Sequence, residues 1–167
     1  MSDFFKAIES GIKAANDAAA NVTEIHQVLA ELGAQLEEFS EGRLKLIKGT
    51  KEVSPDDSST YNPFTSSIVG NAINAFKIKT PKNCLCIKLD GEETLHDISF
   101  YEISKTGYPI SLSFSGKSIT CYDKQGLEDA LRELFSHPDT GKIINRLIAK
   151  AQKLSAENEN SLPPEVN

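Results

Sequence analysis

The side chains of this sequence best suited to bind a metal are its cysteines and two of its histidines. Cys84 and Cys86 stand two residues apart, and residues at that spacing on a strand face the same side. Together with Cys121 and either His96 or His137, they would supply the four ligands of a zinc site. Structural zinc sites usually take paired cysteines from turns, however, and a regular strand holds them poorly. We therefore predict buried cysteines, no metal and no cofactor.

The patterns that could support catalysis are weak. His96 and Asp97 are adjacent, but neighbouring strand residues point to opposite faces, so we do not expect them to act as an acid–base pair. Gly-Lys-Ser at 116–118 leads into a strand, and Asp-Thr-Gly at 139–141 leads into a helix. Neither context fits the phosphate-binding loop or the aspartic-protease loop that it imitates. We predict no catalytic residues. A small enzyme with a site near His96, Asp97 and the cysteine-bearing strands is the alternative, because triads assemble from distant residues.

The charge distribution argues against nucleic acid or an anionic membrane as the partner. Residues 1–41 hold eight acidic and two basic side chains, so this segment accounts for the whole net charge of −6. Carboxylates are repelled by phosphates. Lysine and arginine cluster at 43–51 and 77–88, and a nucleic-acid-binding regulator using this Lys-rich strand face is the second alternative. It is disfavoured because no aromatic side chains are interleaved for base stacking.

Residues 4–41 carry the strongest structural pattern. Apolar and small side chains recur there at alternating steps of three and four, which indicates an acidic, amphipathic, coiled-coil-like helix. The residues that we assign to an oligomer or partner interface are Phe5, Ile8, Ile12, Val22, Ile25, Leu29, Leu32, Leu36 and Phe39. As one helix, this segment would be about 57 Å long. The rest of the chain would form a body only about 35 Å across.

About 20 Å of this apolar seam would then extend beyond the body and need cover from another chain. The alternative is a bent helix or a helical hairpin, because Asn21 and Glu24 imitate a capping box. In that case the segment would fold back on its own body near residue 20.

The remaining elements follow from alternation, turns and caps. Gly42 is expected to end the first helix, and a strand follows at 43–46. Residues 50–67 are expected to form a loop and 64–76 a helix or a strand, running into a strand at 76–80. Further strands are predicted at Cys84–Leu89, Leu95–Ile103, Tyr108–Phe114 and Lys117–Tyr122. Their short connections require antiparallel neighbours.

Two helices are expected to complete the body. Asp123 caps the first, a second capping pattern stands at 136–139, and residues 155–167 are expected to form a disordered tail. The predicted fold is therefore α+β: a long N-terminal amphipathic helix, an antiparallel β-meander of four to five strands and two C-terminal helices. We divide the chain into an acidic helical segment (1–41), an α+β domain (42–154) and the tail.

These features lead us to expect a non-catalytic protein–protein interaction module that forms a homodimer through the seam. Inhibitor, immunity and chaperone-like roles suit such a protein. An odd number of cysteines, early acidic residues and the lack of a long apolar run indicate the cytoplasm and no membrane. On this view, Leu29→Asp and Leu36→Asp should separate the copies and leave the sheet intact.

Overall fold

The computed structural model describes residues 4–53 and 80–160. Most of the predicted loop at 50–67, the helix or strand at 64–76 and the strand leading into residue 80 lie outside the described residues. The same is true of residues 161–167 at the end of the predicted tail.

The N-terminal segment is one continuous helix, α1 (Phe4–Phe39), of 36 residues. It is about 54 Å long, and the hairpin alternative is wrong. Asn16–Ala20 contains three alanines and neither glycine nor proline, so nothing in the sequence interrupts the helix there. The helix ends three residues before Gly42, and the C′ position predicted for Gly42 is taken by Glu41, whose φ is +54°. Gly42, with a φ of +79°, follows it and donates its N–H to the carbonyl oxygen of Glu37 at 2.8 Å.

Within the described residues, five antiparallel strands follow in simple sequence order, which confirms the predicted meander. They are β1 (Leu44–Val53), β2 (Thr80–Leu89), β3 (His96–Ser104), β4 (Gly107–Phe114) and β5 (Lys117–Cys121). The β2–β3 pairing contains a β-bulge, and the register shifts there by one residue. This shift decides which side chains of β2 and β3 meet on one face of the sheet.

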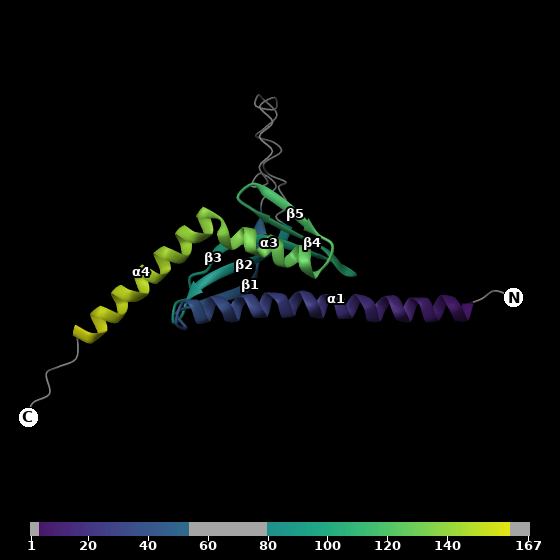
Figure 1. Ribbon diagram of the computed structural model, residues 1–167, viewed down its shortest axis with the longest axis horizontal. Coiled ribbons are helices and arrows are strands. Elements are labelled where there is room, and N and C mark those ends of the chain that lie inside the picture. Colours follow the sequence, from purple (N-terminus) through teal and green to yellow (C-terminus); the bar gives the residue numbers. More distant parts are fainter. Residues whose placement is uncertain (1–3, 54–79, 161–167) are drawn as a thin grey trace, which may run out of the picture.

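Two helices complete the α+β fold (Figure 1): α3 (Lys124–Ser136) and α4 (Pro138–Asn160). The predicted cap is present, because the Asp123 carboxylate accepts a hydrogen bond from the Gly126 N–H at 2.8 Å. The tail predicted from residue 155 is wrong as far as Asn160, where α4 continues. The sequence 155–160 contains no glycine or proline that would end the helix.

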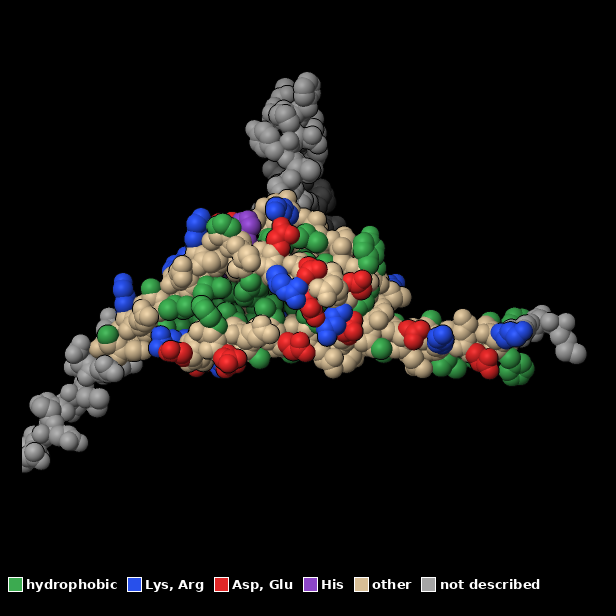
Figure 2. Space-filling view, in the orientation of Figure 1, with side chains coloured by type: hydrophobic (Ala, Val, Ile, Leu, Met, Phe, Trp, Pro, Cys, Tyr) green, Lys and Arg blue, Asp and Glu red, His purple; other side chains and the backbone are tan. Residues whose placement is uncertain are grey.

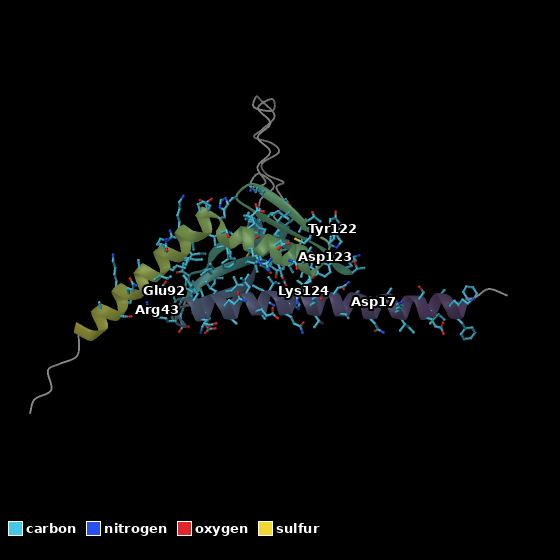
Figure 3. All side chains as sticks on the ribbon, viewed as in Figure 1. Asp17, Arg43, Glu92, Tyr122, Asp123 and Lys124 are labelled. Carbon is cyan, nitrogen blue, oxygen red and sulfur yellow. The ribbon has the colours of Figure 1, made fainter. Side chains whose placement is uncertain are left out.

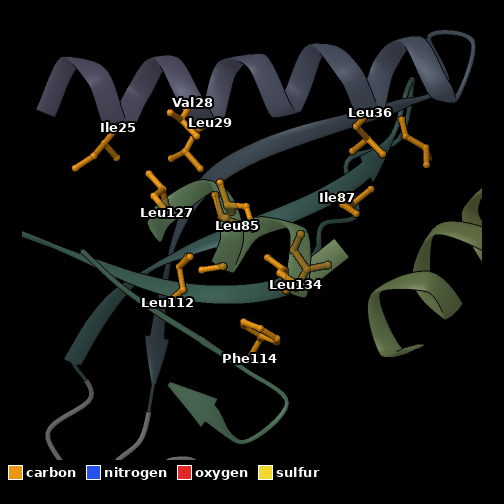
Figure 4. Close-up of a cluster of buried hydrophobic side chains, with 14 of the residues drawn as sticks. Ile25, Val28, Leu29, Leu36, Leu85, Ile87, Leu112, Phe114, Leu127 and Leu134 are labelled. Atoms are coloured by element: carbon orange, nitrogen blue, oxygen red, sulfur yellow. The ribbon is translucent and has the colours of Figure 1, made fainter. Parts of the chain in front are cut away.

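The core lies between the sheet and helices α1 and α3, as the close-up in Figure 4 shows. Ile25, Leu29 and Leu36 of α1 pack there with Leu85 and Ile87 of β2, joined by Leu112, Phe114, Leu127 and Leu134. Residues of the segment 1–41 and of the domain 42–154 therefore share one hydrophobic core. Burial of these side chains is what holds the second half of α1 on the sheet.

The turn between β3 and β4 marks the place where α1 leaves the body. The Asn21 side chain donates a hydrogen bond to the Thr106 carbonyl oxygen at 3.0 Å, and the Tyr108 hydroxyl donates to the Glu24 carboxylate at 3.0 Å. From Ala20 to Phe4 every residue of α1 is exposed except Ala18, which is half-buried. Figure 1 shows this N-terminal half, in purple, extending past the sheet.

Candidate functional site

The exposed half of α1, residues 4–20, is called the overhang below. It is about 25 Å long and carries large apolar side chains in water: Phe4 is 70% exposed, Phe5 84%, Ile8 59% and Ile12 58%. Figure 2 shows green patches along this part of α1. Figure 3 places Asp17 on the part of α1 that extends beyond Tyr122, Asp123 and Lys124 at the start of α3.

The structure divides the predicted interface residues into two groups. Ile25, Leu29 and Leu36 belong to the chain's own core, Leu32 packs against that core, and Val22 is half-buried. Phe5, Ile8 and Ile12 remain exposed, as does Phe39 at the other end. A dimer that used the whole seam would have to remove α1 from its sheet.

This burial also overturns one expectation. A charge at Leu29 or Leu36 would lie in the core without a partner, so Leu29→Asp or Leu36→Asp would unfold the chain instead of separating two copies. The part of the seam that is available to another molecule is the overhang.

The size of the seam side chains changes along the overhang. Its seam begins with the large residues Phe5, Ile8 and Ile12 and ends with the small residues Ala15 and Ala19. All five share one face by their spacing of three and four. The charged residues of the overhang lie off this seam.

A second apolar surface lies on the body. It is a groove with a cavity volume of 680 Å³ between α1, α3 and the start of α4. Figure 2 shows green side chains gathered between these helices. Its apolar lining consists of Val28, Leu32, Leu36, Phe39, Leu131, Phe135 and Ile144.

The cysteines lie elsewhere, and the structure does not assemble the predicted zinc set. Cys121 is buried in the core on β5. His96 Nδ1 lies 3.3 Å from Arg146 Nη2, and His137 Nδ1 lies 3.2 Å from the Ser115 hydroxyl. Neither histidine is therefore placed with Cys84 and Cys86.

A different group surrounds Cys84 and Cys86 on β2. Their sulfur atoms lie 3.4 Å apart, and the Cys86 thiol donates to Asp97 Oδ1 at 3.3 Å. The other oxygen of Asp97 pairs with the ammonium group of Lys51 on β1. Cys84, Cys86, Asp97 and Lys51 are called the cysteine cluster below.

The β-bulge is the reason that Asp97 belongs to this cluster. Leu85 pairs with Ser99, but the next residue, Cys86, pairs with Asp97 and not with Ile98. Ile98 is thereby left to enter the core, while Asp97 shares the face of Cys86. The sequence pattern alone, read with regular alternation, puts Asp97 on the other face.

Cys86 is not an activated nucleophile. Burial is the main cause that raises the pKa of the Cys86 thiol, and hydrogen bonds with Cys84 and Asp97 raise it further. Cys86 is thus a neutral thiol at physiological pH. His96 and Asp97 have different partners, Arg146 for the first and Lys51 with Cys86 for the second. The geometry therefore gives the small-enzyme alternative no nucleophile at this position.

The two basic clusters meet where β1 pairs with β2. Lys45 stands opposite Lys88, and Lys51 opposite Lys82. Carboxylates neutralise part of this surface: Asp90 lies 2.7 Å from the Lys45 ammonium group, and Asp97 pairs with Lys51. The hydrogen bond and the charge of these partners raise the pKa of both lysines. This pairing weakens the case for nucleic-acid binding.

No protein-family model, curated protein or solved structure matches this chain. None of the helices in the described ranges is long and apolar enough to cross a lipid bilayer.

Proposed function

We propose that this protein is a non-catalytic, cytoplasmic protein–protein interaction module that self-associates through the overhang of α1. One observation carries the proposal: Phe4, Phe5, Ile8 and Ile12 stand exposed on a continuous helix beyond the body. A contiguous apolar surface of this kind marks an interaction site. Covering it gains about 25 cal/mol for each Å² of apolar surface removed from water.

The shape of the overhang favours a second copy as the occupant. Two overhangs that pair in antiparallel fashion about Ile12 bring Phe5 of each copy to the Ala19 of the other. Large side chains then fill the space beside small ones, as close helix packing requires. Such a pair has two-fold symmetry, which is the commonest symmetry of homodimers.

The placement of charge is compatible with this pairing. Along the overhang the charges alternate in sign, as Lys6, Glu9, Lys13 and Asp17. These side chains lie off the seam, so pairing two overhangs buries no charge without a partner. Each body begins at Asn21, beyond the N-terminus of the other helix, so the two bodies lie at opposite ends of the pair.

A homodimer of this kind suits the inhibitor, immunity or chaperone-like roles expected from the sequence. Each of these roles works by covering a surface of another protein and requires no chemistry. The three free, buried cysteines are compatible with the reducing cytoplasm.

The test is the molar mass of the full chain, measured by light scattering or sedimentation over a range of concentrations. We expect a dimer that dissociates on dilution. Ile12→Asp should be monomeric at every concentration, with an unchanged circular dichroism spectrum, because it puts two carboxylates at the centre of the pair. The matched control is Ser10→Asp, which adds the same charge at an exposed position off the seam and should remain dimeric. A wild-type mass that stays monomeric, or an Ile12→Asp variant that stays dimeric, would contradict the proposal.

A further inference from the structure

The cysteine cluster has the geometry of an incomplete tetrahedral metal site. The two sulfur atoms are 3.4 Å apart, the Cys86 sulfur is 3.3 Å from the Asp97 oxygen, and all three atoms lie within 4.8 Å of one another. A tetrahedral zinc ion with Zn–S bonds of about 2.3 Å holds two sulfurs about 3.8 Å apart, and a sulfur and an oxygen about 3.5 Å apart. The two pairs that involve the Cys86 sulfur therefore need to separate by only a few tenths of an ångström.

Both cysteines are buried, but at residue 49 β1 places no side chain over their sulfurs. Gly49 stands opposite Cys84, and a Cβ atom at residue 49 would lie 3.3 Å from the Cys84 sulfur and 3.9 Å from the Cys86 sulfur. A glycine within a strand often marks a place where a ligand approaches closely. Here it keeps the space beside both sulfurs free of a side chain.

The charges of the cluster balance those of a divalent ion. Lys51 lies on β1 and Asp97 on β3, so the lysine side chain crosses the face of β2 to make its ion pair. Two thiolates and one carboxylate carry three negative charges, and one divalent ion with the Lys51 ammonium supplies three positive charges. The loaded site is thus neutral, which reduces the cost of placing an ion between two buried cysteines.

We propose that Cys84, Cys86 and Asp97 bind one zinc ion, with its fourth position open to water. Lys51 is a positioning residue that holds the Asp97 carboxylate through its second oxygen. On binding, each cysteine gives up its thiol proton to solvent and forms a Zn–S bond, so two protons are released for each ion. The carboxylate of Asp97 supplies the geometric clamp that a Cys-x-Cys strand lacks by itself. The site is independent of the proposed dimer.

Cobalt(II) is the probe, because thiolate ligands give it a charge-transfer band in the near ultraviolet and tetrahedral geometry gives it strong visible bands. We expect one equivalent of Co²⁺ to produce both in the reduced full-length protein and Zn²⁺ to displace it. Cys84→Ser and Cys86→Ser should lose the charge-transfer band. Cys121→Ser, which removes the third buried cysteine, is the matched control and should keep it.

Two further variants test the third ligand, Asp97, and the residue that positions it, Lys51. Asp97→Asn should weaken cobalt binding at least tenfold, and Lys51→Met about tenfold, as expected for a residue that orients a ligand. If a serine variant does not fold, as judged by circular dichroism, these two variants decide the outcome. No charge-transfer band in the wild type, or equal affinity in the wild type and Asp97→Asn, would overturn the proposal.

Discussion

Tyr108 joins the middle of α1 to the sheet with one hydrogen bond, and it makes that junction sensitive to pH. Its hydroxyl donates to the Glu24 carboxylate at 3.0 Å. Burial, followed by the hydrogen bond and the charge of Glu24, raises the pKa of Tyr108 above its usual value. The folded protein therefore favours the neutral phenol.

The sign of the pH dependence follows from this shift. A raised pKa in the folded state adds stability that is fully present below the pKa of the unfolded tyrosine, about 10. That stability is lost as the pH rises above 10 toward the pKa of the folded protein. We expect Tyr108→Phe to lower the free energy of unfolding by about 1 kcal/mol at pH 7, and we expect this difference to shrink above pH 10.

Urea denaturation at neutral and alkaline pH measures both effects. The control is Tyr122→Phe, which changes a 75% exposed side chain. It should alter the free energy by less than about 0.5 kcal/mol. Equal stability of Tyr108→Phe and the wild type at pH 7 would show that the hydrogen bond does not hold α1 on the sheet.

The turn between β3 and β4 lies where α1 leaves the body, and Gly107, the first residue of β4, is the critical residue beside it. Its φ is +87°, and a Cβ atom there would lie 2.4 Å from the Asn21 Cβ. Gly116, in the turn between β4 and β5, has a similar φ of +76° with no atom within 4 Å of its Cβ position. Both glycines have a backbone conformation that would be strained for any other residue, but only Gly107 lies against α1.

Alanine at both positions separates these two costs. Gly116→Ala should lower the free energy of unfolding by about 1 kcal/mol, from backbone strain alone. Gly107→Ala should cost about 3 kcal/mol or more, because α1 must move away from the turn. Chemical denaturation gives both values, and amide hydrogen exchange should show faster opening of α1 near Asn21 in Gly107→Ala. Equal costs for the two variants would mean that the close approach of the helix does not matter.

The molecule as a whole has a body and an overhang that leaves it on the side away from α4 (Figure 1). If the overhangs pair, association adds to stability by mass action, and each tenfold rise in protein concentration stabilises the dimer by about 1.4 kcal/mol. The melting temperature should therefore rise with concentration in the wild type and in Ser10→Asp. In Ile12→Asp it should be constant. Calorimetry at three concentrations tests this, and a wild-type melting temperature that does not change would argue against self-association.

Features that depend on short segments could be read from the sequence. The long helix, its end close to Gly42, the cap at Asp123 and the meander follow from periodicity, capping and turn chemistry, which are properties of a few neighbouring residues. The end of α4 was missed because polar residues at 155–160 resemble a tail, although they include no helix breaker.

The sequence by itself determined that α1 carries more apolar length than a small body can cover, because helix rise and chain length set both dimensions. The tertiary structure decided which half is covered, because this depends on where the sheet and α3 pack against the helix. The apolar side chains between Ile25 and Leu36 pack in the core, and those between Phe5 and Ile12 are exposed to water. It also decided that Asp97 faces Cys86. One inserted residue in β3 reverses the face of every side chain beyond it, and such a bulge leaves no mark in composition or spacing.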